Sequence, residues 1–158
     1  MLTNRFALTA AATALSCLCA SAVRAADMVT TSVSASPSTV APGGKGSLTI
    51  TLTFAPGAHV NAHKLPNADF IPTTFVPQSM SSVKVGAAKF PAGVEMTTAG
   101  MKEVVYNKPT KIVVPFTVAK TAKPGSLLIG GKLTYQACNT AVCYPPKTVS
   151  ALTAVTIK

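Results

Sequence analysis

Residues 47–54 read SLTITLTF, and apolar side chains occupy every second position of this stretch. Leu48, Ile50, Leu52 and Phe54 alternate with serine and threonine. Successive side chains of a β-strand point to opposite faces, so this alternation predicts a strand that is buried on one face only. No stretch of the chain sustains a helical period over three turns, and the fold class therefore follows from strands.

Similar runs rich in β-branched residues recur along the chain. They lie at residues 30–35, 82–85, 102–106, 111–118, 126–136 and 148–157. Turn signals separate them, namely PGG at 42–44, PG at 56–57, PAG at 91–93 and KPG at 123–125. Seven or eight short strands punctuated in this way predict an all-β domain, an immunoglobulin-like antiparallel β-sandwich of two packed sheets.

The N-terminal residues 1–25 have the pattern of a secretory signal peptide. A single positive charge at Arg5 precedes an apolar run over 6–20, and small residues stand before Ala26. The run is shorter than the ~20 residues of a permanent span, so we expect export without stable membrane insertion. A lipoprotein signal with anchoring at Cys17 is the competing interpretation. Residues 26–158 are then one domain.

The charge of the expected mature chain is basic but carried by lysine alone. Its 12 lysines face four carboxylates, a net charge of +8, and the only arginines, Arg5 and Arg24, lie in the signal peptide. Proteins that bind nucleic acid cluster their positive charge and use the forked guanidinium of arginine. Because the lysines are scattered singly, we expect a solvated basic surface and no nucleic-acid partner.

The informative segment is 133–147, LTYQACNTAVCYPPK. Cys17 and Cys19 lie in the signal peptide, so Cys138 and Cys143 are the two cysteines expected in the mature chain, and an oxidising compartment favours their pairing. The four residues between them make a short connection, which would place the cysteines opposite each other on a hairpin-like turn. Facing side chains lie within ~5 Å, a separation that suits a disulfide.

Two further features describe this disulfide. Pro145 and Pro146 lack amide donors, so the segment should lie at a sheet edge near solvent. A bridge that closes six residues restrains the unfolded chain by only about 2 kcal/mol, against about 4 to 5 kcal/mol for a long loop. Its loss should therefore be tolerable, as a reversible redox couple requires. A fixed disulfide in a structural or interaction domain remains the alternative.

The sequence YQACNTAVCYPPK, residues 135–147, resembles the active-site segment of the N-terminal periplasmic domain of the thiol:disulfide interchange protein DsbD, with its YQxC…CYPP pattern. Residues 59–75, HVNAHKLPNADFIPTTF, resemble a segment of stand-alone relatives of that domain. The resemblance implies a periplasmic immunoglobulin-like domain without a cofactor. In it, Cys138 and Cys143 would pass two electrons from a membrane-embedded reductase to thioredoxin-like exported proteins.

The resemblance also implies roles for single residues. Exchange through a mixed disulfide needs one exposed sulfur and one that resolves it, and by the resemblance Cys143 would be the attacking thiol, although the sequence alone does not decide the order. Tyr135, Tyr144 and Tyr106 are candidates for shielding the pair, or for ordinary packing. Two features depart from the family: four residues instead of five separate the cysteines, and residues 100–109 contain no phenylalanine where relatives have an aromatic cap.

A copper site is the main alternative of another class. The candidate ligands are two histidines, a cysteine and one of three methionines, namely His59, His63, Cys143, and Met80, Met96 or Met101. Blue-copper domains place a histidine soon after the cysteine, whereas Tyr-Pro-Pro follows it here. Hydrolysis is disfavoured, because the scattered carboxylates form no acid–base pair and no serine lies in an elbow motif.

Overall fold

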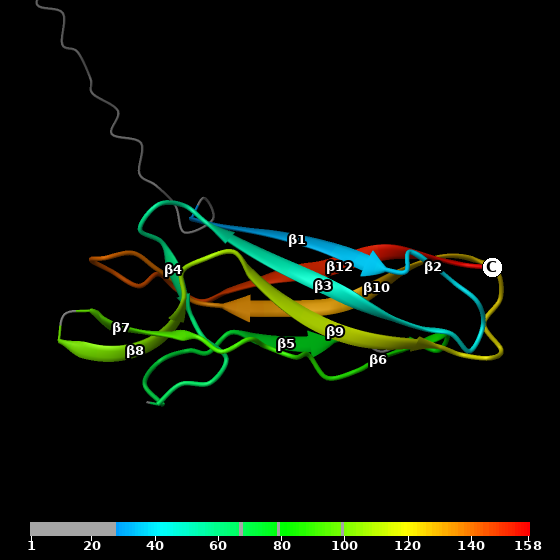
Figure 1. Cartoon of the computed structure of the whole chain (residues 1–158), viewed down its shortest axis with the longest axis horizontal. Coiled ribbons are helices and arrows are strands. Elements are labelled where there is room, and N and C mark those ends of the chain that lie inside the picture. Colours follow the sequence, from blue (N-terminus) through cyan, green and yellow to red (C-terminus); the bar gives the residue numbers. More distant parts are fainter. Residues whose placement is uncertain (1–27, 67, 79, 99) are drawn as a thin grey trace, which may run out of the picture.

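The computed structural model describes residues 28–66, 68–78, 80–98 and 100–158. The predicted signal peptide, residues 1–25, and the alternative anchor Cys17 lie outside these ranges. The named elements of the described residues are all β-strands, in three four-stranded sheets (Figure 1). No helix in these ranges has the length and apolar character that crossing a membrane requires.

The first sheet contains the stretch SLTITLTF. Its strands, in spatial order, are β1 (Val29–Ser36), β3 (Lys45–Phe54), β9 (Thr110–Val118) and β6 (Val83–Val85). All three neighbouring pairs are antiparallel. Leu48, Ile50 and Leu52 are fully buried while the alternating residues of β3 are more accessible, as the period of two predicts.

The second sheet packs against the first. Its strands, in spatial order, are β2 (Thr39–Val40), β12 (Lys147–Ile157), β10 (Gly125–Tyr135) and β5 (Thr74–Pro77). β10 and β12 pair along their whole length, and the buried Ile129 and Leu133 of β10 contribute to the core shared by the sheets. The short β2 pairs with β12 in parallel, a local departure from the antiparallel pattern. It arises because the chain crosses from β1 in the first sheet to the edge of the second.

Two glycines allow β10 to lie between its neighbours. Gly130 has φ +144°, and a Cβ there would collide with the carbonyl oxygen of Ala151 on β12. A Cβ on Gly131 would collide with the carbonyl oxygen of Val76 on β5. Glycine is required here by close backbone approach.

The third sheet is small and lies at the end of the sandwich remote from the C-terminus (Figure 1). Its strands, in spatial order, are β11 (Ala137–Cys138), β4 (His59–Asn61), β8 (Met101–Tyr106) and β7 (Val94–Thr98). The immunoglobulin-like β-sandwich is confirmed, and all seven predicted runs are strands. The five further strands β2, β4, β5, β7 and β11 have two to five residues each and lie outside the predicted runs.

Substitution by alanine should destabilise the protein more at a buried position of β9 than at its exposed neighbour. Ile112 is fully buried, whereas Val113 is 38% exposed on the opposite face. We expect Ile112→Ala to lower the free energy of unfolding by about 2–5 kcal/mol, because it removes buried apolar surface and leaves a cavity. The control Val113→Ala should cost less than about 1 kcal/mol. Urea denaturation measures both, and equal losses would contradict the assigned faces of β9.

Candidate functional site

The two cysteines form a disulfide at the end of the β10–β12 ladder. Cys138 and Cys143 are bonded, with Cα atoms 4.0 Å apart, and they face each other as an isolated antiparallel bridge. The ladder ends at the pair Tyr135↔Lys147, so the disulfide segment is an excursion between two strands held together at its base. This is the hairpin-like juxtaposition that the spacing of the cysteines predicts.

The two sides of the disulfide differ in accessibility. Cys138 is fully buried on β11, the edge strand of the third sheet, whereas Cys143 is exposed. Pro145 and Pro146 follow on the exposed side, as expected from their missing amide donors. Cys143 is therefore the more accessible residue of the pair.

The connection between the cysteines is held in shape by Asn139. Its Oδ1 accepts hydrogen bonds from the amides of Ala141 and Val142, both at 2.8 Å. Its Nδ2 donates to the hydroxyl of Tyr144 at 3.4 Å, and its amide donates to the carbonyl of Val142 at 2.9 Å. An asparagine that bonds the backbone two and three residues on stabilises a tight turn, so the loop has a defined shape.

One face of the third sheet is polar although it is buried. His59 on β4 lies directly opposite Cys138 on β11, and facing residues in an antiparallel pair share a face. Asn61 lies opposite Val105 of β8, which puts Glu103, two residues earlier, on that face too. Cys138, His59, Asn61 and Glu103 are each at most 4% exposed. Such a row is unusual, because buried polar groups cost free energy unless they are paired.

His59 and Glu103 are a buried acid–base pair. The His59 Nε2 and Glu103 Oε2 atoms lie 3.7 Å apart, and neither has a hydrogen-bond partner. Desolvation by burial lowers the pKa of His59 below its ordinary value of 6.5, and the charge of Glu103 opposes this effect. The imidazole is therefore neutral at neutral pH and can accept a proton.

Asn61 forms hydrogen bonds to the segments that cover this face of the third sheet. Its Nδ2 donates to the Ile71 carbonyl and to Gln136 Oε1, both at 3.1 Å. The hydroxyl of Thr73 donates to the Asn61 carbonyl at 2.6 Å, and Gln136 Nε2 donates to the Tyr144 carbonyl at 3.2 Å. These bonds tie the loop before β5 and the segment after Cys143 to the third sheet.

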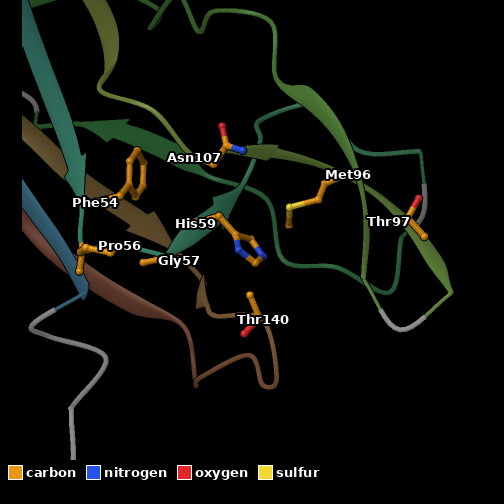
Figure 2. Close-up of a pocket in the computed structure, with 10 residues that line it drawn as sticks. Phe54, Pro56, Gly57, His59, Met96, Thr97, Asn107 and Thr140 are labelled. Atoms are coloured by element: carbon orange, nitrogen blue, oxygen red, sulfur yellow. The ribbon is translucent and has the colours of Figure 1, made fainter.

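Two hollows meet at His59. A cleft of about 340 Å³ is lined by residues of four segments, namely His59, Asp69, Phe70, Met101, Glu103, Gln136, Asn139, Ala141, Val142 and Cys143. Its apolar members include Phe70, which is half-buried, and Met101 and Val142, which are 54% and 53% exposed. Figure 2 shows the second hollow, of about 570 Å³, with the His59 side chain projecting between Met96 and Thr140.

The tyrosines expected near the disulfide lie in three different environments. Tyr135 is in the sandwich core, where desolvation by burial raises its pKa. Tyr106 faces away from His59 and donates to the Pro91 carbonyl at 2.9 Å. Burial raises its pKa too, and the amide of His63, which donates to its hydroxyl, opposes this.

Tyr144 is half-buried beside the connection, and none of the three tyrosines lines the cleft at Cys143. Phe70 and Met101 line it instead. Sequence reasoning did not single out Phe70, although it falls within the quoted segment 59–75, and it considered Met101 only as a candidate copper ligand. Phe70 was the harder of the two to place. It lies in an irregular loop, where no periodicity indicates which way a side chain points.

The two candidate metal-binding histidines point to different surroundings. His59 is buried beside Glu103, whereas His63 is exposed and its ring stacks on Phe90 with centroids 3.9 Å apart. His63 Nδ1 also lies 3.0 Å from the Thr73 carbonyl oxygen. Over the described ranges, no three His, Cys, Asp or Glu side chains gather as a metal site.

The family model described as the N-terminal part of the thiol:disulfide interchange protein DsbD matches residues 26–154. The chain belongs to this family. The predicted resemblance to the N-terminal domain of DsbD is thereby confirmed.

Solved structures support the fold of a DsbD N-terminal domain. The N-terminal periplasmic domain of ScsB from Proteus mirabilis is similar with a TM-score of 0.53 and 19% identity, over 80% of this chain and 46% of that one. At this identity the likeness concerns the fold alone, and the chain spans less than half of that structure. A family 123 glycoside hydrolase from Clostridium perfringens aligns with a TM-score of 0.31 and 7% identity, over 82% of this chain and 27% of that one, and carries no argument. No curated protein matches the chain.

The buried imidazole should make stability depend on pH. The folded state binds a proton at His59 less readily than the unfolded chain does, so the free energy of unfolding should decrease as pH falls through about 6.5. We expect His59→Gln to reduce this slope, measured by urea denaturation at pH values from about 5 to about 8. The exposed His63→Gln is the matched control and should keep the wild-type slope. An unchanged slope in His59→Gln would refute the assignment.

Proposed function

We propose that this domain performs thiol:disulfide interchange, carrying two electrons in the Cys138–Cys143 pair and exchanging them with thioredoxin-like partners. The observation that carries the proposal is the disulfide itself, with one exposed and one fully buried cysteine, in a chain of the DsbD N-terminal family. A structural bridge gains nothing from exposing one of its cysteines. Exchange requires it, because a partner thiolate must approach one sulfur in line with the bond.

The exchange proceeds in two displacements. A thiolate of the reduced partner attacks the Cys143 sulfur, a mixed disulfide forms, and Cys138 leaves with the electron pair of the broken bond. The second thiol of the partner then attacks the partner's first sulfur, which is bonded to Cys143 in the mixed disulfide, and Cys143 is released. The partner ends as a disulfide and the domain as a dithiol. The same steps in reverse deliver the two electrons to an oxidised partner.

The fold supports a bond that opens and closes. The ends of the disulfide segment are held by the pair Tyr135↔Lys147 and by the amide of Tyr144, which donates to the Ala137 carbonyl at 2.8 Å. These bonds do not depend on the sulfur–sulfur bond. The Asn139 turn gives the connection a shape of its own as well. Reduction therefore leaves both sulfurs near their positions.

The surroundings of Cys143 suit a protein partner. Phe70, Met101 and Val142 form an apolar rim around the cleft that contains its side chain. Apolar side chains at the centre of a contact exclude water when a partner docks. We also propose that Phe70 and Met101, which line this cleft, help to cover Cys143 when a partner docks. We propose that the partner is an exported thioredoxin-like protein, that the domain is periplasmic, and that a membrane-embedded reductase supplies its electrons.

The reduction potential of the pair tests the proposed function. The oxidised domain, residues 26–158, is equilibrated with glutathione buffers of graded composition, and free thiols at Cys138 and Cys143 are trapped by alkylation and counted by mass spectrometry. We expect a potential between about −180 and −270 mV, the span of working exchange proteins. A potential below about −300 mV belongs to structural bridges and would contradict the proposal in favour of a fixed disulfide.

Single cysteine variants test the assigned order. Cys138→Ser leaves the exposed Cys143 without its resolving partner, so it should accumulate a mixed disulfide with an oxidised thioredoxin-like protein. Cys143→Ser is the matched control and should accumulate much less, because Cys138 is fully buried. Non-reducing electrophoresis and mass spectrometry of the linked peptides measure both. Trapping that is stronger in Cys143→Ser would reverse the order.

A further inference from the structure

Opening of the disulfide creates a problem of charge at Cys138. When Cys143 is attacked, Cys138 leaves as a thiolate in a place that is fully buried. An isolated charge in such surroundings is strongly disfavoured unless a partner pairs with it or a proton neutralises it. In the reverse direction, Cys138 must lose a proton before it attacks the mixed disulfide. Both directions therefore need a group that holds a proton beside this sulfur.

His59 is the group placed to do this. It is the cross-strand partner of Cys138 and projects from the same face of the sheet, where facing side chains lie within ~5 Å. It also lines the cleft that contains Cys143, as does Glu103 behind it. Of the other groups around this cleft, Asp69 is an exposed residue, and the β7 residue opposite Glu103 is Met96, which does not titrate.

The state of the His59–Glu103 pair indicates a proton-holding role. The Nε2 atom of His59 and the Oε2 atom of Glu103 face each other at 3.7 Å, which is too far for a hydrogen bond. Both atoms are buried, and neither has another hydrogen-bond partner. Buried polar atoms are almost always bonded. Asn61 Oδ1 and the Tyr135 hydroxyl also lack a partner, but among the described residues only at His59 and Glu103 does an imidazole face a carboxylate. A carboxylate next to an imidazole stabilises the imidazolium that forms when a proton is taken up.

We propose that His59, supported by Glu103, donates a proton to the Cys138 sulfur when the disulfide opens and accepts it back when the disulfide closes. The inference rests on the proposed function and specifies the residues that move the proton.

The steps balance in both directions. As the partner thiolate bonds to Cys143, the electron pair of the broken bond passes to the Cys138 sulfur. His59 takes up a proton from solvent through the cleft, the carboxylate of Glu103 stabilises the imidazolium, and the proton moves on to the Cys138 sulfur, which leaves the imidazole neutral again. On closure, His59 takes the proton of the Cys138 thiol, the thiolate attacks Cys143 in the mixed disulfide, and the partner leaves as a thiolate. Burial lowers the pKa of His59 and so keeps the imidazole ready to accept.

A two-step chromogenic reaction isolates the step in question. Reduced domain reacts with dithionitrobenzoate, so that attack by Cys143 releases a first coloured thiolate and attack by Cys138 releases a second. Both releases are followed in stopped flow at pH values from about 5 to about 9. The variants are His59→Gln and Glu103→Gln, and the matched control is His63→Gln, an exposed histidine four positions from His59.

We expect the second release to slow by roughly 100-fold at neutral pH in His59→Gln, the size of a lost general base. Its pH inflection should also move up towards the ~8.5 of an ordinary thiol. Glu103→Gln should shift the inflection in the same direction by less. The first release should change less than about threefold in either variant, and His63→Gln should match the wild type in both steps.

The outcomes separate this inference from the proposed function. Absence of the second release in the wild type overturns the proposed function, because the pair then does not exchange. Two normal releases with an unchanged pH profile in His59→Gln overturn the role of His59 alone. Circular dichroism establishes that each variant is folded. If His59→Gln does not fold, Glu103→Gln provides the test. An unchanged pH profile of the second release in Glu103→Gln would then overturn the proton-transfer role of the His59–Glu103 pair.

Discussion

The antiparallel ladder between β10 and β12 is the constraint on which the rest depends. It pairs the two strands from Gly125↔Ile157 to Tyr135↔Lys147, the longest pairing among the described residues. The chain leaves this ladder at one end to form β11 and the disulfide turn, and then returns. The disulfide segment therefore extends from a paired base, and the ladder holds its ends together independently of the sulfur–sulfur bond.

The small third sheet supplies what the sandwich cannot. The main sheets bury apolar faces against each other, whereas the third sheet buries a polar face under the loop before β5 and the cysteine connection. Asn61 Nδ2 bonds to the covering segments, whereas His59 Nε2 and Glu103 Oε2 have no hydrogen-bond partner. Such unpaired atoms are costly in a scaffold. They are useful beside a sulfur that must change its charge.

Much of this molecule could be predicted from its residues. Alternation and β-branched runs, as in SLTITLTF, indicate seven of the strands, and all of these except β6 have six or more residues, enough to show which side is buried. The spacing of Cys138 and Cys143 indicates their pairing, because four residues admit only a tight turn, and the flanking prolines place that turn at an edge. The motif itself indicates the family. These are local properties, decided by residues adjacent in the chain.

Only the tertiary structure decided what surrounds the disulfide. β4 has three residues and β11 has two, so neither shows a period, and their pairing brings His59 to Cys138 across nearly eighty positions of sequence. The loop that carries Phe70 is irregular, and its path depends on the hydrogen bonds of Asn61 and Thr73. The sequence by itself determined the sandwich, the cysteine pair and its edge position. The tertiary structure decided which cysteine is buried and which acid–base pair stands beside it, because contacts between distant short segments leave no pattern in either one.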